Sequence, residues 1–118
     1  NYGMSGRSLL STSDYPYLQE KNAQASLQSD ADIVIIMIGS NDSRAAYWNR
    51  EQFVKEYRDF AEAYIQLASQ PEVFLVAPPY VPTSRFGLNN DIVRDDSTLS
   101  ISILLQKESW TIIAMACT

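Results

Sequence analysis

The sequence predicts an α/β fold in which an open, doubly wound parallel sheet is flanked by helices. Two apolar runs typical of buried strands, Ile33–Ile38 and Val73–Ala77, are separated by a long amphipathic helical pattern. Strands that alternate with helices in this way imply parallel pairing with right-handed crossovers. The length of 118 residues fits a single domain, residues 1–118, and is sufficient to bury a core.

The first half of the chain predicts a loop, a helix and a strand. Residues 1–13 are rich in Gly, Ser and Asn and predict a loop. Residues Tyr17–Ser29 follow as an expected helix. The continuous, β-branched run Ile33–Ile38 predicts a strand that is covered on both faces. A loop is then expected over Ser40–Asn49.

A second helix is predicted over Glu51–Ser69. Apolar side chains recur there at helical spacing and form one stripe: Phe53, Tyr57, Phe60, Tyr64 and Leu67. Asn49, followed three residues later by Gln52, predicts a capping box at the start of this helix. We interpret the aromatic stripe as core rather than as a cofactor site.

The last third of the chain has a weaker pattern. The strand Val73–Ala77 is closed by Pro78–Pro79, which cannot continue a hydrogen-bonded ladder. A loop is expected through Asn90, followed by a helix that ends near Glu108. Thr111–Met115 is a candidate third strand.

Composition excludes several classes of function. The net charge of −5 argues against nucleic acid as a partner. The longest apolar run is too short to span a bilayer. No signal peptide is visible, and the compartment stays unknown because the sequence starts with Asn1. A single cysteine excludes an internal disulfide or a cysteine-built metal site, and the absence of histidine removes the usual general base. No metal or organic cofactor is expected.

A polar cluster, Gly39–Asp42, follows the first predicted strand. In open parallel sheets, ligands bind beyond the carboxyl ends of the strands, and Pro78–Tyr80 should lie at the same edge. In a purely structural interpretation, the glycine permits a tight turn and Asn41 or Asp42 caps the next segment. In a functional interpretation, the Asn41 amide is a donor for developing negative charge, and a backbone N–H beside Gly6 is a second one.

Two polar blocks in this order resemble the SGNH (GDSL-type) hydrolases. The sequence N-x-G-x-S-G, then a helix, then "DIVIIMIGSND", "W-N-x-E-x-F" and "PP", covers about Asn1–Val93. These hydrolases are flavodoxin-like esterases and lipases, many of which remove acyl groups from carbohydrates. The resemblance implies a flavodoxin-like sheet and a small-molecule or carbohydrate acyl ester as substrate.

The resemblance also assigns residues to the site. It implies that the backbone N–H of Gly6 and the side-chain amide of Asn41 face the oxyanion. Ser5, Ser40 and Asp42 are expected beside them as binding residues. Asp42 is expected to hold the loop by accepting backbone N–H groups rather than to take part in the chemistry.

The sequence departs from this family in its remaining catalytic blocks. It contains neither the Gly-Asp-Ser segment with the nucleophile nor the Asp-x-x-His pair. We therefore expect an internal fragment, or the product of a frame-shifted gene, with an incomplete SGNH-hydrolase fold and negligible turnover. In the family's strand order 2-1-3-4-5 the first strand is central, so its loss would leave the strand at Ile33 with an unpaired edge and an uncovered apolar face, an aggregation hazard.

No other residue is a good candidate to replace the missing nucleophile or the missing aspartate–histidine pair. Serines near the site and lysines elsewhere lack a visible partner, and we expect them to be solvated or structural: Ser5, Ser8, Ser11, Lys21, Lys55 and Lys107. Cys117 is expected to be an inert, packed thiol, and Asp95–Asp96 to be surface charge. Residues Asn41–Ser43 also match a glycosylation sequon, but a glycan there would block the oxyanion role.

Two rival interpretations belong to other classes. In the first, the chain is a non-catalytic α/β binding or self-assembly module whose exposed sheet edge pairs with a partner or a second copy. In the second, it is a receiver-like signalling domain. Receivers need an acidic cluster at a strand end, and Asp42 has no acidic pair at the end of an earlier strand.

Overall fold

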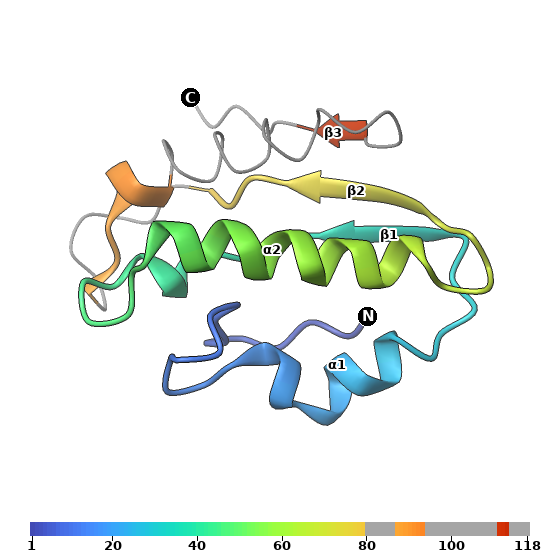
Figure 1. Ribbon diagram of the computed structural model, residues 1–118, viewed down its shortest axis with the longest axis horizontal. Coiled ribbons are helices and arrows are strands. Elements are labelled where there is room, and N and C mark those ends of the chain that lie inside the picture. The colour runs from blue at the N-terminus through green and yellow to red at the C-terminus, as the bar shows by residue number, and fades with distance from the viewer. Residues whose placement is uncertain (80–86, 94–110, 114–118) are drawn as a thin grey trace.

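The computed structural model describes residues 1–79, 87–93 and 111–113. Figure 1 shows α2 running alongside β1 and β2, with α1 and the N-terminal segment on the β1 side of the sheet. The elements follow in this order: η1 (Tyr17–Gln19), α1 (Lys21–Ser26), β1 (Ile33–Ile36), η2 (Asn41–Ser43), α2 (Arg50–Ile65), β2 (Glu72–Val76) and β3 (Thr111–Ile113).

The sheet contains three described strands in the order β1-β2-β3, and both pairings are parallel. Ile33 lies opposite Glu72 in the first ladder, and Phe74 lies opposite Thr111 in the second. Helix α2 forms the crossover between β1 and β2. This parallel βαβ arrangement confirms the predicted α/β class with helices flanking an open sheet.

Strand β1 lies at an edge of the sheet, because β2 is its only neighbour among the described strands. Side chains on one face are open to solvent: Ile33 is 60% exposed, Ile35 68% and Met37 54%. On the other face Ile36 is only 5% exposed. The prediction of a strand covered on both faces is therefore wrong, whereas the uncovered apolar face expected from the missing first strand is present. A continuous apolar run indicates a strand suited to burial on both faces, but it does not show whether another element covers each face.

The expected helix Tyr17–Ser29 is broken into two short pieces. A 3₁₀ turn, η1, is followed by the six-residue helix α1. Glu20 between them has extended backbone angles, φ −82° and ψ 148°, which interrupt the helix. Only Tyr17, Ala23 and Ser26 of these two elements are buried. So few buried side chains provide little tertiary packing to stabilise a longer helix over this segment.

Helix α2 agrees closely with its prediction. It begins at Arg50, and the Asn49 side chain accepts a hydrogen bond of 3.0 Å from the backbone N–H of Gln52. The Gln52 side chain does not complete the expected capping box, since its amide reaches Glu56 at 3.0 Å instead. The helix ends at Ile65, four residues before the predicted end.

A tight turn connects α2 to β2. Gln70 has a φ of +50°, in the left-handed region that favours glycine, and Pro71 follows it. Strand β2 then begins at Glu72, one residue before its prediction, and ends at Val76. The predicted end of α2 and the predicted bounds of β2 both differ from the structure at element ends, where local sequence patterns are least informative.

Residues 90–93 are helical, as expected for the start of the last predicted helix. The Asn89 side chain caps it, because its oxygen accepts hydrogen bonds from the N–H groups of Asp91 at 3.0 Å and Ile92 at 3.3 Å. Strand β3 begins at Thr111 as predicted. Several predictions lie outside the described residues: the helix end near Glu108, the strand end at Met115, and the roles of Lys107, Cys117 and Asp95–Asp96.

The core lies between α2 and the covered face of the sheet. Its buried members include four side chains of the predicted α2 stripe, together with residues of the strands and of the N-terminal segment: Phe53, Tyr57, Phe60, Tyr64, Ile36, Val73, Leu75, Leu9 and Leu10. None of the helices in the described part of the chain is long and apolar enough to cross a membrane.

Candidate functional site

The loop after β1 turns sharply at Gly39. Its φ of +129° is a conformation that a side chain would strain, which explains why glycine stands at this position. The short helix η2 follows directly and carries Asn41 and Asp42. Strand β1 thus delivers the predicted polar cluster to the carboxyl end of the sheet, where ligands bind in open α/β folds.

Asp42 is completely buried and fastens the N-terminal segment to this loop. Its two carboxylate oxygens accept hydrogen bonds from the backbone N–H groups of Leu9 at 3.0 Å and Leu10 at 2.6 Å. Burial raises the pKa of the Asp42 carboxyl, and these two bonds oppose the shift. The contacts are those of a carboxylate that positions a loop, and they bring residues 1–10 against η2.

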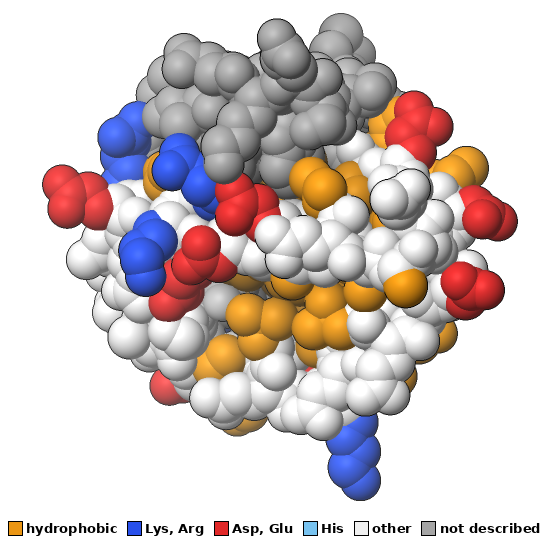
Figure 2. Space-filling view, turned by 45° about the vertical axis from the view of Figure 1, so that its right-hand side comes forward, with side chains coloured by type: hydrophobic (Ala, Val, Ile, Leu, Met, Phe, Trp, Pro, Cys, Tyr) orange, Lys and Arg blue, Asp and Glu red, His pale blue; other side chains and the backbone are white. Residues whose placement is uncertain are grey.

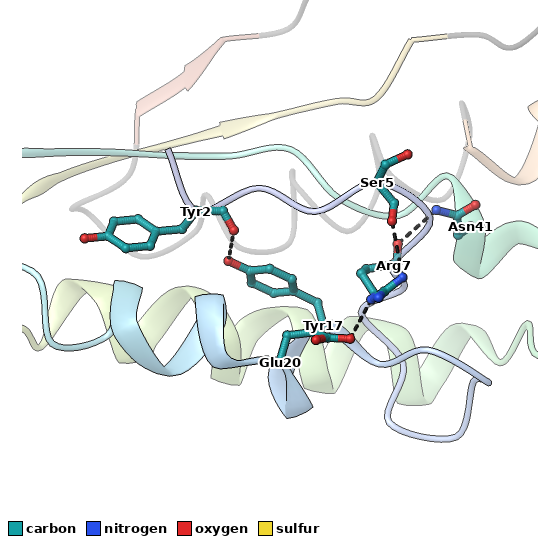
Figure 3. Close-up of polar contacts among 6 residues, drawn as sticks. All are labelled: Tyr2, Ser5, Arg7, Tyr17, Glu20 and Asn41. Atoms are coloured by element: carbon teal, nitrogen blue, oxygen red, sulfur yellow. Dashed lines mark hydrogen bonds and ion pairs between the residues drawn. The ribbon is translucent and has the colours of Figure 1, made fainter.

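Asn41 is thereby placed beside the segment that contains Gly6. Its side-chain amide donates a hydrogen bond of 2.9 Å to the carbonyl oxygen of Arg7, the residue after Gly6 (Figure 3). An asparagine amide has two N–H donors, so this bond fixes the amide while leaving the second donor free to point elsewhere. Asn41, far from Gly6 in sequence, is therefore bonded to the residue that follows Gly6.

Gly6 has a φ of +75°, again in the region that favours glycine. Its backbone N–H makes no hydrogen bond to any residue that the structure describes. An unpaired N–H on an exposed turn is available to a bound ligand. Gly6 and Asn41 thus contribute two donors to the same part of the surface.

A hollow of about 890 Å³ adjoins these donors and follows the free edge of β1. The predicted site residues Ser5, Gly6, Ser40 and Asn41 line it, whereas Asp42 lies behind the wall. Figure 2 shows hydrophobic side chains gathered in a recess on one face of the molecule. The hollow therefore has a polar end at the donors and an apolar wall along the strand.

Ser5 and Ser40 make their hydrogen bonds to described residues through their backbone carbonyl groups. The Ser5 carbonyl oxygen accepts a hydrogen bond of 3.3 Å from the Arg7 guanidinium. The Ser40 carbonyl accepts 2.7 Å and 3.2 Å bonds from the Ser43 hydroxyl and N–H. Neither hydroxyl makes a hydrogen bond to a described residue. A direct binding role for these hydroxyls stays a prediction.

Sequence analysis missed an ion pair on the opposite side of Arg7. Its guanidinium Nε lies 2.6 Å from a carboxylate oxygen of Glu20. The segment is tied to the same region by the Tyr17 hydroxyl, which donates to the Tyr2 carbonyl at 2.8 Å. No local pattern marks Arg7 and Glu20 as partners, because they are 13 positions apart and lie on no common helix face.

A second missed carboxylate is Glu56 on α2. It accepts hydrogen bonds from the hydroxyl of Ser11 at 2.6 Å and from its N–H at 2.9 Å. Partial burial acts to raise the pKa of Glu56, but hydrogen bonds from Ser11 and Gln52 outweigh it and hold the pKa below its ordinary value. A carboxylate with a lowered pKa is a poor base, so this pair does not form an activated nucleophile.

The lysines considered as catalytic bases are also unsuitable. Lys55 lies 4.0 Å from Asp59, and their side chains are 80% and 63% exposed, as expected for solvated charges. Lys21 is also exposed. The described residues contain no group of His, Cys, Asp and Glu side chains that could hold a metal ion.

The sequon at Asn41 is poorly placed for a glycan. The Asn41 amide is engaged with Arg7, and Ser43 is completely buried. The Ser43 hydroxyl accepts a hydrogen bond of 2.9 Å from the N–H of Asn89. A glycan at Asn41 would break the Arg7 contact that orders this loop.

Comparisons with known proteins give one family and one relative. The family model for GDSL-like lipase/acylhydrolases matches residues 1–96. An acetylxylan esterase of Xylanibacter ruminicola is 34% identical over 73 residues, which are 62% of this chain and 14% of that esterase. The chain thus spans a small part of this relative. No solved structure matches significantly.

Proposed function

The chain belongs to the GDSL-like lipase/acylhydrolase family, and on that basis we propose that it carries the oxyanion hole of an esterase that hydrolyses O-acyl esters. The donors are the Gly6 backbone N–H and the Asn41 side-chain amide. The observation that carries this proposal is the hydrogen bond from Asn41 to the Arg7 carbonyl, which fixes the amide beside an unpaired glycine N–H.

These two donors suit the chemistry of ester hydrolysis. Attack on an ester carbonyl places negative charge on the carbonyl oxygen, and donors that are already oriented stabilise that charge without reorganising. Arg7 takes one N–H of the Asn41 amide, which leaves the other for the oxyanion. Removing one such donor in an enzyme costs roughly 10²–10³ in rate.

The substrate that we propose is an acyl ester on a small molecule or a carbohydrate. Support comes from the relative named an acetylxylan esterase, although the match covers only 14% of that protein. The hollow beside Asn41 offers space for the ester at its polar end.

We propose that residues 1–118 do not contain the nucleophile or the aspartate–histidine pair. The sequence has no histidine, and each serine tested as a substitute lacks an activating base. The domain is thus an incomplete SGNH-hydrolase unit, and the chain alone should not turn over.

The test has two parts. The source DNA on both sides of this segment should be sequenced and translated in all reading frames. It should encode Gly-Asp-Ser before the segment and Asp-x-x-His after it. In the completed protein, Asn41→Ala should then lower kcat on an acetyl ester by about 10²–10³, while the exposed Asp59→Asn serves as the control.

Other results would refute the proposal. Natural start and stop codons at both ends, with neither motif nearby, would rule out a severed esterase. Ester hydrolysis by the 118-residue chain that Asn41→Ala abolishes would show instead that the chain is complete for catalysis.

A non-catalytic assembly module remains the second candidate, and the open edge of β1 favours it. One edge of β1 has no neighbour among the described strands, so another strand can pair there, and Ile33 and Ile35 on the adjoining face are more than half exposed. A single defined oligomer in light scattering would support this candidate. A monomer that stays monodisperse would exclude it.

A further inference from the structure

Arg7 connects the candidate oxyanion donors to a carboxylate outside the hollow. Its carbonyl oxygen holds the Asn41 amide on one side, while its guanidinium binds Glu20 on the other, as Figure 3 shows. The same guanidinium donates to the Ser5 carbonyl at 3.3 Å and lies over the Tyr15 ring at 5.3 Å. The Arg7 side chain is therefore held at three points.

The Arg7 side chain affects the candidate site because it limits the motion of the backbone at Gly6. Gly6, its neighbour, is an exposed residue in a left-handed conformation, and glycine has the widest conformational freedom of any residue. The Gly6 N–H therefore stays in place only if the residues around it are fixed. Contacts that immobilise the Arg7 side chain and the Ser5 carbonyl limit the motion of the backbone between them.

The geometry of the Glu20 contact makes it strong. At 2.6 Å it is a charge-assisted hydrogen bond, and the Arg7 and Glu20 side chains are only 24% and 29% exposed. The Lys55–Asp59 pair, at 4.0 Å and largely exposed, is weak by comparison. Glu20 precedes α1 but makes no side-chain capping bond there, so its carboxylate is committed to Arg7.

We propose that Glu20 is a positioning residue for the oxyanion hole. Through the Arg7 guanidinium it fixes the Arg7 carbonyl that orients Asn41 and the backbone turn that presents the Gly6 N–H. This inference rests on the proposed function for its meaning, but the coupling from Glu20 to Asn41 is measurable without any ester hydrolysis.

The test uses the ¹⁵N-labelled 118-residue chain and the side-chain amide signal of Asn41, assigned by its loss in Asn41→Asp. We expect Glu20→Ala to move this signal and to speed exchange of the Asn41 amide protons with water by roughly tenfold, the effect of losing a hydrogen bond to a charged group. Glu20→Gln keeps an acceptor oxygen and should restore most of the wild-type shift. The matched control, Asp59→Asn, should leave the signal unchanged.

The outcomes separate positioning from simple stabilisation. If Glu20→Ala and Glu20→Gln both leave the Asn41 signal where it is, the proposal is overturned, whatever they do to the melting temperature. If Glu20→Ala does not fold, Glu20→Asp, whose shorter side chain cannot keep the 2.6 Å contact to Arg7, takes its place: a displaced Asn41 signal supports the proposal and an unchanged signal refutes it. Failure of the esterase assay would not alter either result.

Discussion

Tyr64 on α2 and Ser26 on α1 share a hydrogen bond of 2.6 Å between their buried hydroxyl groups. The Ser26 hydroxyl also donates to the Ala23 carbonyl at 2.6 Å. Because a serine hydroxyl has one hydrogen, Tyr64 must be the donor in the pair. This bond joins the short helix α1 to the long helix that forms much of the core.

Tyr64→Phe should therefore destabilise the protein. The change removes a buried hydrogen bond without changing the ring, so we expect a loss of about 1 kcal/mol in the free energy of unfolding. Urea denaturation measures this loss. An unchanged midpoint would show that α1 is not held through this contact.

Tyr57→Phe on the same helix should have the opposite sign. The Tyr57 hydroxyl is buried and has no hydrogen-bond partner among the described residues, and burial also raises its pKa. Removing this unpaired polar group should increase stability by about 1 kcal/mol. A clear loss of stability would reveal a partner for this hydroxyl, such as an ordered water.

Asp42→Ala should release the N-terminal segment from η2. The buried N–H groups of Leu9 and Leu10 lose their acceptors, and we expect a cost of about 2–4 kcal/mol. Hydrogen exchange should show faster exchange at both amides. If exchange at Leu9 and Leu10 stays slow, another group must accept these bonds.

Glu56 should make stability depend on pH in the acid range. Its pKa is below the ordinary value of 4.5 in the folded protein, so the unfolded chain binds more protons in that range. The stability that the carboxylate contributes is present above pH 4.5 and is lost as pH falls through the lower, folded pKa.

The measurement compares wild type with Glu56→Gln in urea between about pH 3 and 6, a range around the ordinary glutamate pKa. The difference in unfolding free energy should shrink on acidification. The exposed Glu51→Gln serves as the control on the same helix. A difference that does not vary with pH would contradict the assigned shift.

Gln70→Gly should stabilise the turn before β2. Gln70 has a φ of +50°, which costs a residue with a side chain about 1–2 kcal/mol. Glycine avoids this cost but loses roughly 0.5–1 kcal/mol of chain entropy, so the net gain is about 0.5–1 kcal/mol. Thermal unfolding measures it. A lower melting temperature would mean that the Gln70 side chain makes stabilising contacts.

Sequence patterns predicted the long elements better than their surroundings. The stripe from Phe53 to Tyr64 specified α2, because each helical turn repeats the signal. The run at Ile33 specified a strand but not its neighbours, and the exposed face of β1 was expected only from the family resemblance, through the missing first strand. Number and placement of neighbours depend on the whole sheet, and a local run contains no information about them.

The candidate site shows the same division. Family resemblance brought Gly6 and Asn41 into one hypothesis, and the Asn41 contact lies one residue after Gly6. The carboxylates that hold the N-terminal segment, Glu20 and Glu56, gave no sequence signal. Each meets a partner far along the chain, and surface glutamates are too common for their spacing to be informative.

The fastening of the N-terminal segment has a consequence for biosynthesis. Ser11 leaves the ribosome 45 residues before Glu56, the group that binds its N–H and hydroxyl. At roughly 5–20 residues per second, the segment waits about 2–9 seconds before that partner has been synthesised. The contact of Ser11 with α2 therefore forms only after residues 50–56 of that helix have been synthesised.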